Sequence, residues 1–272
     1  MKFEESSYWR QRVAGDSDLG VVGHRALGRG YNEYIYRRRT ECLMEALRLL
    51  DIKPSQCKVL DLGCGSGYYA TFWKKLGVTE LTGIDIADAS VDRLRKKFPE
   101  YMFLQADITQ ADIAKRIGGL YSIVTLFDVI YHISDDTAAL EALKTAAGAL
   151  QPDGVLMLFE QLAPRDYSLL PHVKFRGKMN YMALLDAAGL KIVSRQPLFV
   201  FLAPPVYGFK AIDIVVSGLY KIIGAFIKNR DGAGRRLGKA VYELDQFLIK
   251  KGISLPNHEL IVLRKHASDE LV

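Results

Sequence analysis

Two stretches in the first third of the chain combine glycines with carboxylates at a spacing that suits ligand binding. The run from Asp61 to Gly67 reads DLGCGSG and follows a short apolar segment, and Asp85 ends the next apolar segment. Glycine adopts positive φ and lets a ligand approach the main chain closely. A carboxylate at the tip of the neighbouring strand can accept hydrogen bonds from both hydroxyls of a ribose. The pattern therefore predicts one half of a nucleoside-binding site.

The nature of that nucleoside depends on Asp61. The segment 65–70 also fits a variant of the dinucleotide fingerprint, which would place a pyrophosphate against the glycine turn. Asp61 stands directly before the glycines, and a carboxylate beside a pyrophosphate is costly because like charges repel. A ligand with a cationic ammonium and sulfonium, such as S-adenosylmethionine, suits this acid better than NAD does.

Histidines supply the candidates for a proton acceptor. His132 and His172 follow two predicted strands, at the edge of the sheet where ligands bind in open α/β folds. Imidazole is the natural general base near neutral pH, so we predict His132 and His172 as catalytic residues, with His24 as a third candidate. The other residues predicted to contact an acceptor are Tyr31, Tyr34, Tyr131 and Arg176.

The hydrophobic pattern predicts the elements that position these residues. Strands are expected at 58–62, 80–85, 102–106, 121–127, 155–160, within 190–201 and at 259–264, and helices at 7–12, 31–50, 68–76, 89–98, 135–149 and 180–188. Strands that alternate with helices from 58 to 160 indicate parallel βαβ units in a doubly wound α/β sheet. Residues 203–258 are predicted to be helical, with a glycine- and arginine-rich break at 231–236.

Five motifs resemble, in order and spacing, those of class I S-adenosylmethionine-dependent methyltransferases of the small-molecule type. They are Asp61-x-Gly63-x-Gly65-x-Gly67, Asp85, Gln105-Ala106-Asp107-Ile108, Phe127-Asp128-Val129-Ile130-Tyr131-His132 and Leu150-Gln151-Pro152-Asp153-Gly154. The resemblance covers residues 45–200 and implies a seven-stranded Rossmann-like sheet with an N-terminal helical cap. It also implies that the strand at 259–264 is the seventh and antiparallel one, after a helical insertion between strands six and seven.

The resemblance also implies cofactor contacts, residue by residue. Asp85 would bind the ribose hydroxyls, Asp107 would accept from the adenine amino group, and Phe127 and Asp128 would close the fourth strand near the methyl group. Ile86 and Ile108 would pack beside the adenine. The residues that would line the methionine moiety are Asp61, Gly63, Cys64, Gly65 and Gly67.

Bulk properties exclude several classes of protein. The chain has 272 residues, a net charge of +6 and three cysteines without metal-ligand spacing, so we expect no metal and a reducing, cytoplasmic location. The basic charge is too dispersed to indicate nucleic acid, and its densest cluster, the arginines at 37–39, is expected to form a solvated face of a helix. No apolar run is long enough to span a membrane. We expect a single domain with a cap at 1–50, a cofactor-binding core at 51–202, an insertion at 203–257 and a last strand at 258–266.

The insertion leaves three interpretations open. Its apolar residues from Ile212 to Ile227, interrupted and followed by lysines and arginines, suit a lid over a hydrophobic acceptor, a packed core or homodimer contact, or association with a membrane surface. The sequence as a whole predicts methyl transfer from S-adenosylmethionine to a small-molecule acceptor at a hydroxyl, by in-line displacement with a histidine base. The alternatives are a C- or N-methyltransferase of the same fold and a non-catalytic S-adenosylmethionine-binding protein.

Overall fold

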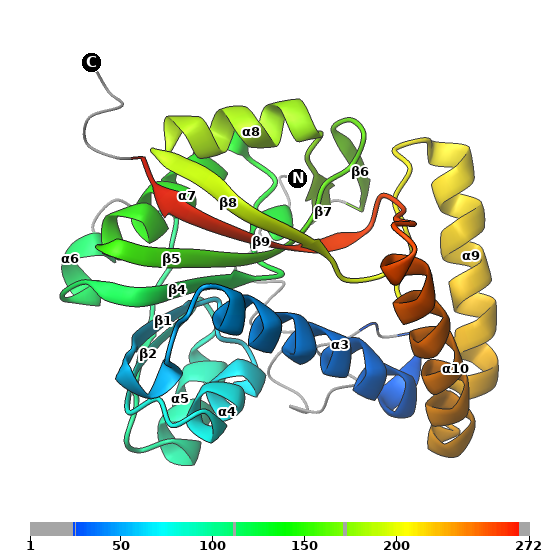
Figure 1. The fold of residues 1–272 in the computed structure, drawn as a ribbon, viewed down its shortest axis with the longest axis horizontal. Coiled ribbons are helices and arrows are strands. Elements are labelled where there is room, and N and C mark those ends of the chain that lie inside the picture. Colours follow the sequence, from blue (N-terminus) through cyan, green and yellow to red (C-terminus); the bar gives the residue numbers. More distant parts are fainter. Residues whose placement is uncertain (1–23, 25, 111–112, 171–172, 267–272) are drawn as a thin grey trace.

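The computed structural model describes residues 24, 26–110, 113–170 and 173–266 (Figure 1). Seven strands form one sheet in the order β3-β2-β1-β4-β5-β9-β8. The strands of this sheet are β1 Lys58–Leu62, β2 Glu80–Asp85, β3 Met102–Gln105, β4 Tyr121–Phe127, β5 Leu150–Gln161, β8 Leu190–Pro197 and β9 His258–Lys265. The helices are α3 Gly28–Leu49, α4 Tyr68–Lys75, α5 Asp88–Lys97, α6 Ile113–Ile117, α7 Asp136–Ala149, α8 Lys178–Ala187, α9 Lys210–Ile227 and α10 Asp231–Lys250, with the 3₁₀ turns η1 Pro54–Gln56 and η2 Ile130–His132.

Helices cover both faces of the sheet, which explains the almost continuous apolar character of the central strands. Val59 of β1 packs into a core with residues of α3, α4 and α5, whereas its neighbour Leu60 packs into a second core with residues of α7 and α8. Figure 1 shows α4 and α5 on one side of the sheet and α7 and α8 on the other. The predicted doubly wound α/β sheet is therefore confirmed.

The parallel strands bring their carboxyl ends to one edge. In the register, Asp61 of β1 pairs with Thr125 of β4, and Asp85 of β2 pairs with Gln105 of β3. The last strand, β9, runs antiparallel between β5 and β8, as expected, so its first residue, His258, lies opposite Gln161 at the same edge. All of the strand-end residues that the motifs singled out therefore converge on this edge.

Two features around β5 differ from the sequence prediction. A hairpin of β6 Tyr167–Leu170 and β7 Val173–Phe175 follows β5, where no strands were expected. The motif at 150–154, which precedes the strand expected at 155–160, falls within the bounds of β5.

Helices α9 and α10 stand at one end of the molecule and pack on the start of α3 (Figure 1). The break predicted at 231–236 is wrong, because α10 begins at Asp231 and continues through these glycines. Of these glycines, Gly234 lies close to α3, where a Cβ would be 3.2 Å from the Tyr31 amide nitrogen, whereas a Cβ on Gly232 would have nothing within 4 Å. The two helices also meet at Gly30 of α3, where a Cβ would lie 2.2 Å from the Asp231 carbonyl oxygen, and at Gly238, where a Cβ would lie 3.2 Å from Tyr31 Cα. Among the described residues, no helix has the length and apolar character needed to cross a bilayer.

Candidate functional site

The glycine turn after β1 leaves space on one side only. Gly63, Gly65 and Gly67 have φ of +82°, +51° and +74°, all in the left-handed region. A Cβ on Gly63 would lie 2.4 Å from a methyl of Val129, and one on Gly67 would lie 2.2 Å from a methyl of Leu94. At Gly65 the nearest atom would be 3.9 Å away, so this residue presents bare main chain to open space. The turn can therefore receive a ligand at Gly65.

Asp61 carries a buried carboxylate that is only half satisfied. Its residue is 1% exposed, and Oδ1 accepts a hydrogen bond from Thr125 Oγ1 at 2.7 Å. Oδ2 is buried without a hydrogen-bond partner among the described residues. Burial raises the pKa of Asp61 to about 6, against 3.8 for an exposed aspartate. An unpaired carboxylate oxygen beside the glycine turn suits a cationic group.

Asp85 braces the same turn from the tip of β2. Its Oδ2 accepts from the Gly65 amide at 2.7 Å, and its Oδ1 accepts from the Ala87 amide at 2.9 Å. The Gly65 amide therefore already donates to a carboxylate, so a phosphate could not use it as a hydrogen-bond donor. With Asp61 nearby, a pyrophosphate would meet two carboxylates, which favours an S-adenosyl cofactor over a dinucleotide.

The end of β3 lies next to Asp85. The Ala106 amide donates to the Asp85 carbonyl at 3.0 Å, and Gln105 Nε2 donates to the Ile86 carbonyl at 3.2 Å. Asp107 accepts from both the amide and the hydroxyl of Thr109, which fixes its carboxylate in a local turn. Ile108 follows and is buried. The structure thus brings the residues expected around adenine to one place.

Cys64 faces away from the turn. A Cβ on Gly83 of β2 would lie 3.1 Å from Cys64 Sγ, so the thiol packs against the neighbouring strand. Burial raises the pKa of this thiol well above its ordinary value. Its side chain acts as packing under the turn, and only its main chain belongs to the ligand-facing loop.

At the end of β4, Asp128 forms an ion pair that the sequence did not indicate. Asp128 adopts a left-handed φ of +61°. Arg39 of α3 donates from Nη2 to Asp128 Oδ1 at 3.0 Å, and its Nη1 lies 2.5 Å from Oδ2. The guanidinium lies over the rings of Tyr36, Phe159 and Phe199 at 5.3–5.9 Å from their centroids.

The expectation that the cluster at 37–39 forms a solvated face is therefore wrong for two of its members. Arg38 and Arg39 are buried, and Arg38 donates to the carbonyls of Pro197 and Leu198. The helical period gave a signal for Arg39, because it lies on the same stripe as Tyr36 and Leu43, which are both buried.

His258 is a second residue of this site that the sequence did not reveal. Its Nε2 lies 3.9 Å from Asp128 Oδ1, and its Nδ1 lies 3.2 Å from Asn257 Oδ1. The Asn257 amide nitrogen donates to the carbonyls of Val200 and Ala203, which fixes the amide oxygen toward His258. The proton of the neutral ring is thereby assigned to Nδ1, which leaves Nε2 as an acceptor. Burial, with Arg39 nearby, lowers the pKa of His258 to about 3 and keeps the ring neutral.

Of the three histidines predicted as candidate bases, the structure describes His132 and His24. His132 is half-buried in η2, and its ring centroid lies 4.4 Å from that of Tyr131. The ring centroid of Tyr131 lies 6.1 Å from that of His258. His24 lies 6.2 Å from Tyr220 of α9, and its main-chain amide donates to Asn32 Oδ1. His172 lies outside the described residues.

Arg176 does not face an acceptor. Its residue is 1% exposed, and its guanidinium donates to Asp136 Oδ1 and to the carbonyls of Ile130, Ile133 and Asp135. With its donors bound within the protein, Arg176 holds the loop after β4 in place. The prediction that Arg176 contacts the acceptor is therefore wrong.

Tyr31 and Tyr34 also take structural positions. Tyr31 is 2% exposed and lies beneath Gly234 and Gly238 of α10. The Tyr34 ring packs on the Tyr242 ring at 5.9 Å. Both residues join α3 to α10, Tyr31 through its main chain and Tyr34 through its ring, so we do not propose either as a contact of the acceptor.

Comparison with known proteins identifies the class. Residues 34–195 match the family model described as a methyltransferase domain, and the chain therefore belongs to this family. Its sheet, its glycine turn and the carboxylates at the strand ends are those of a class I S-adenosylmethionine-dependent methyltransferase. The cofactor is S-adenosylmethionine, which the unpaired oxygen of Asp61 and the open face of Gly65 fit.

Individual relatives are more distant. A ubiquinone biosynthesis O-methyltransferase of Xanthomonas axonopodis is 32% identical over 110 residues, which cover 39% of this chain and 44% of that protein. The structure of an O-methyltransferase from a Brevibacillus brevis polyketide synthase aligns with a TM-score of 0.54 and 16% identity over 82% of this chain and 71% of the other. An N-methyltransferase of Bradyrhizobium japonicum aligns with a TM-score of 0.55 and 18% identity over 72% and 91%. The chain thus spans less than half of the ubiquinone enzyme that it matches.

Proposed function

We propose that this methyltransferase transfers the methyl group of S-adenosylmethionine to a hydroxyl of a small-molecule acceptor bound where β4, β5 and β9 meet. The observation that carries the proposal is the imidazole of His258 at this edge, with Nδ1 3.2 Å from Asn257 Oδ1 and Nε2 3.9 Å from Asp128 Oδ1. A hydroxyl must lose its proton as it is methylated. Its oxygen becomes strongly acidic as the bond to the methyl group forms, so a neutral imidazole can take the proton even with a low pKa. O-methyltransferases occur both among the curated relatives and among the solved structures with this fold.

In this proposal the cofactor is held by residues already in place. Asp61 Oδ2 would bind the ammonium of the methionine moiety, and Gly65 would lie against that moiety. Each oxygen of Asp85 accepts one amide hydrogen bond and keeps a lone pair with which to accept a ribose hydroxyl. Asp107 and Ile108 would bind the adenine. The bound cofactor supplies the electrophilic methyl group.

The chain's own residues would then orient the acceptor. Arg39 pairs with the Asp128 carboxylate and would hold it in place at the tip of β4. The rings of Phe159 and Phe199 border the ion pair and exclude water, which favours an apolar acceptor. His132 and His172 remain the alternative bases proposed from the sequence.

The test is a transfer assay with isotope-labelled S-adenosylmethionine. Matched acceptors that differ in one group, a phenol, the corresponding aniline and the corresponding thiol, are compared, and the product is identified by mass spectrometry and NMR. We expect label on oxygen. Label on nitrogen or carbon would refute the hydroxyl proposal, and tight binding of S-adenosylhomocysteine without transfer to any acceptor class would favour a non-catalytic binding protein.

Asp85→Ala is expected to weaken the binding of S-adenosylhomocysteine at least roughly tenfold. Two ribose hydrogen bonds to a charged acceptor are lost, each worth about 1.5–3 kcal/mol. Isothermal titration calorimetry measures the effect, and Asp88→Ala, an exposed acid at the start of α5, is the matched control. An unchanged affinity in Asp85→Ala would exclude the ribose role.

His258→Gln is expected to lower kcat by roughly a hundredfold while the affinity for S-adenosylhomocysteine stays unchanged, because only the proton acceptor is removed. Single-turnover kinetics and calorimetry separate the two effects. His132→Gln is the matched control. If His132→Gln reduces kcat and His258→Gln leaves kcat unchanged, the base is His132. If His258→Gln lowers turnover and cofactor affinity in parallel, His258 is a structural residue.

A further inference from the structure

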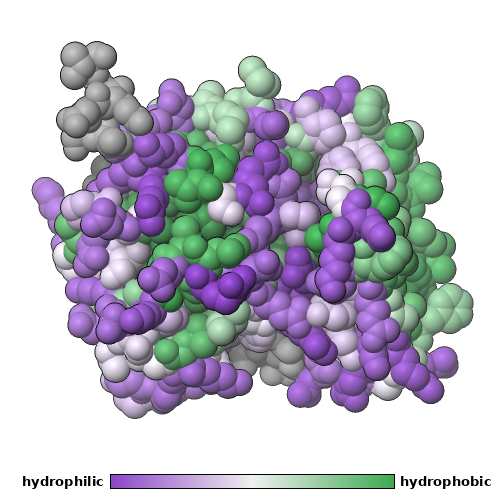
Figure 2. All heavy atoms as spheres, viewed as in Figure 1, coloured by the Kyte–Doolittle hydropathy of each residue, from purple (hydrophilic) through white to green (hydrophobic). Residues whose placement is uncertain are grey.

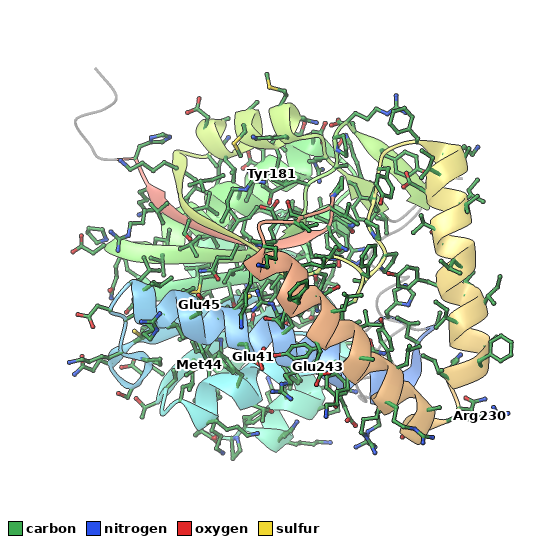
Figure 3. The ribbon with its side chains drawn as sticks, turned by 45° about the vertical axis from the view of Figure 1, so that its right-hand side comes forward. Glu41, Met44, Glu45, Tyr181, Arg230 and Glu243 are labelled. Atoms are coloured by element: carbon green, nitrogen blue, oxygen red, sulfur yellow. The ribbon has the colours of Figure 1, made fainter. Side chains whose placement is uncertain are left out.

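The outer face of α9 carries exposed apolar side chains at helical spacing. Ile212, Val215, Leu219, Ile222 and Phe226 recur at intervals of three and four residues, Ile214 lies beside them, and each of the six is exposed by 47–71%. We call these side chains the α9 stripe. Figure 2 shows apolar surface along the side of the molecule that α9 forms, and in Figure 3 the side chains of α9 project away from the protein, with Arg230 just beyond its end.

The opposite side of α9 is fixed to the protein. Tyr220 and Ile227 are buried, and the Tyr220 hydroxyl donates to the Phe201 carbonyl. Gly224 approaches the first described residues so closely that a Cβ would lie 2.1 Å from the Ala26 carbonyl oxygen. The rotation of α9 about its axis is therefore set, and the α9 stripe faces outward.

Lysines run along the edge of the α9 stripe that Ile214 forms, because Lys210 lies one helical turn before Ile214 and Lys221 lies two turns after it. Lys210, Lys221 and Lys228 are spaced eleven and seven residues apart, close to whole numbers of helical turns, so they lie on the same side of the helix. All three are exposed. The acid of α9, Asp213, is buried, and its Oδ1 accepts from the Tyr207 amide at 2.7 Å. Within Lys210–Ile227, all of which the structure describes, the exposed surface therefore carries apolar and positive groups and no carboxylate.

We propose that the α9 stripe binds the surface of a lipid bilayer that contains anionic lipids. A helix lying in the plane of the interface buries its apolar face at the boundary of the acyl chains, and lysines at its edge reach the phosphates. The charge on α9 complements such a surface. A second copy of the chain fits less well, because in a two-fold antiparallel pair of α9 helices the lysine row of one copy would meet that of the other.

Flotation of the full chain with two kinds of vesicle tests the proposal. One is phosphatidylcholine alone, and the other is an equal mixture of phosphatidylcholine and phosphatidylglycerol. We expect binding to the mixed vesicles that weakens with added salt. Ile222→Asp should reduce it at least roughly tenfold. Met179→Asp, which alters an 86% exposed methionine on α8, is the matched control and should bind as the unaltered chain does.

A second pair of measurements separates charge from apolar contact. Lys221→Gln combined with Lys228→Gln should weaken binding to the mixed vesicles by roughly thirtyfold and leave phosphatidylcholine binding unchanged. Sedimentation velocity without lipid should show one species whose size Ile222→Asp does not alter. Equal binding to both vesicles, or normal binding by Ile222→Asp, would overturn the proposal, as would a dimer that Ile222→Asp dissociates. Binding of S-adenosylhomocysteine checks that each variant is folded. If the protein binds the mixed vesicles but does not methylate oxygen, the proposed function is wrong and the membrane proposal stands.

Discussion

Replacing Arg39 with methionine is expected to lower the free energy of unfolding by about 3 kcal/mol. Methionine retains the apolar contacts with Tyr36 and Phe159 but removes the cation from Asp128. The Asp128 side chain is 20% exposed, so its carboxylate would stay largely desolvated without a counter-ion. This partial exposure places the loss at the lower end of the range measured for broken buried pairs. Denaturant unfolding monitored by circular dichroism measures the change.

Arg37→Met is the matched control for this experiment. Arg37 lies two positions earlier on the same helix, its side chain is 59% exposed, and it pairs with Glu41 one turn away. Exposed pairs of this kind contribute about 0.5 kcal/mol or less. Comparable losses in both variants would show that Arg39 acts through helix propensity and not through Asp128.

Asp61→Asn is expected to stabilise the protein without cofactor and to impair cofactor binding. Asparagine keeps the oxygen that accepts from Thr125 but removes a charge that is buried and half unpaired. We expect the free energy of unfolding at neutral pH to rise by about 1–2 kcal/mol. The affinity for S-adenosylhomocysteine should fall by roughly thirtyfold or more, because a charged hydrogen bond to the ammonium is lost.

The pH dependence gives an independent readout of Asp61. Because its pKa lies at about 6 in the folded protein and 3.8 in a free aspartate, the folded chain holds the extra proton between these values. The contribution of Asp61 to stability therefore decreases as the pH rises from about 4 to 6 and stays low above that. Cofactor affinity moves the other way and strengthens as the pH rises toward 6, since the ionised form binds the ammonium. Asp61→Asn should lose both dependences; a variant that keeps them would assign the titration to another group.

The parts of the fold that were predicted correctly depend on local patterns. The strands at 58–62, 80–85 and 121–127 have the predicted bounds, because helices cover both sheet faces and the strands read as short apolar runs. The glycine turn was found because positive φ restricts the residue type at each position. The start of α10 was missed because glycine usually ends a helix, whereas α10 continues through Gly232 and Gly234, and Gly234 lies against Tyr31 of α3.

The residues missed at the site depend on contacts between distant parts of the chain. Arg39 meets Asp128 across 89 positions, and local charge counting places an arginine cluster on the surface. His258 stands in the last strand, and only the antiparallel insertion of β9 beside β5 brings it to the edge with Asp128. Arg176 was assigned to the acceptor because the sequence does not show that the loop after β4 needs its donors.

The glycine contacts between α3 and α10 limit how this enzyme can be re-engineered. Helix α3 delivers Arg39 to the tip of β4 and is pressed at its other end against α10, with Gly30 against Asp231 and Tyr31 beneath Gly238. The insertion is therefore not an independent module that can be exchanged to change the acceptor. A chimera that carries a foreign insertion must bring its own counterpart of α3 with it, and with that helix the counter-ion of Asp128.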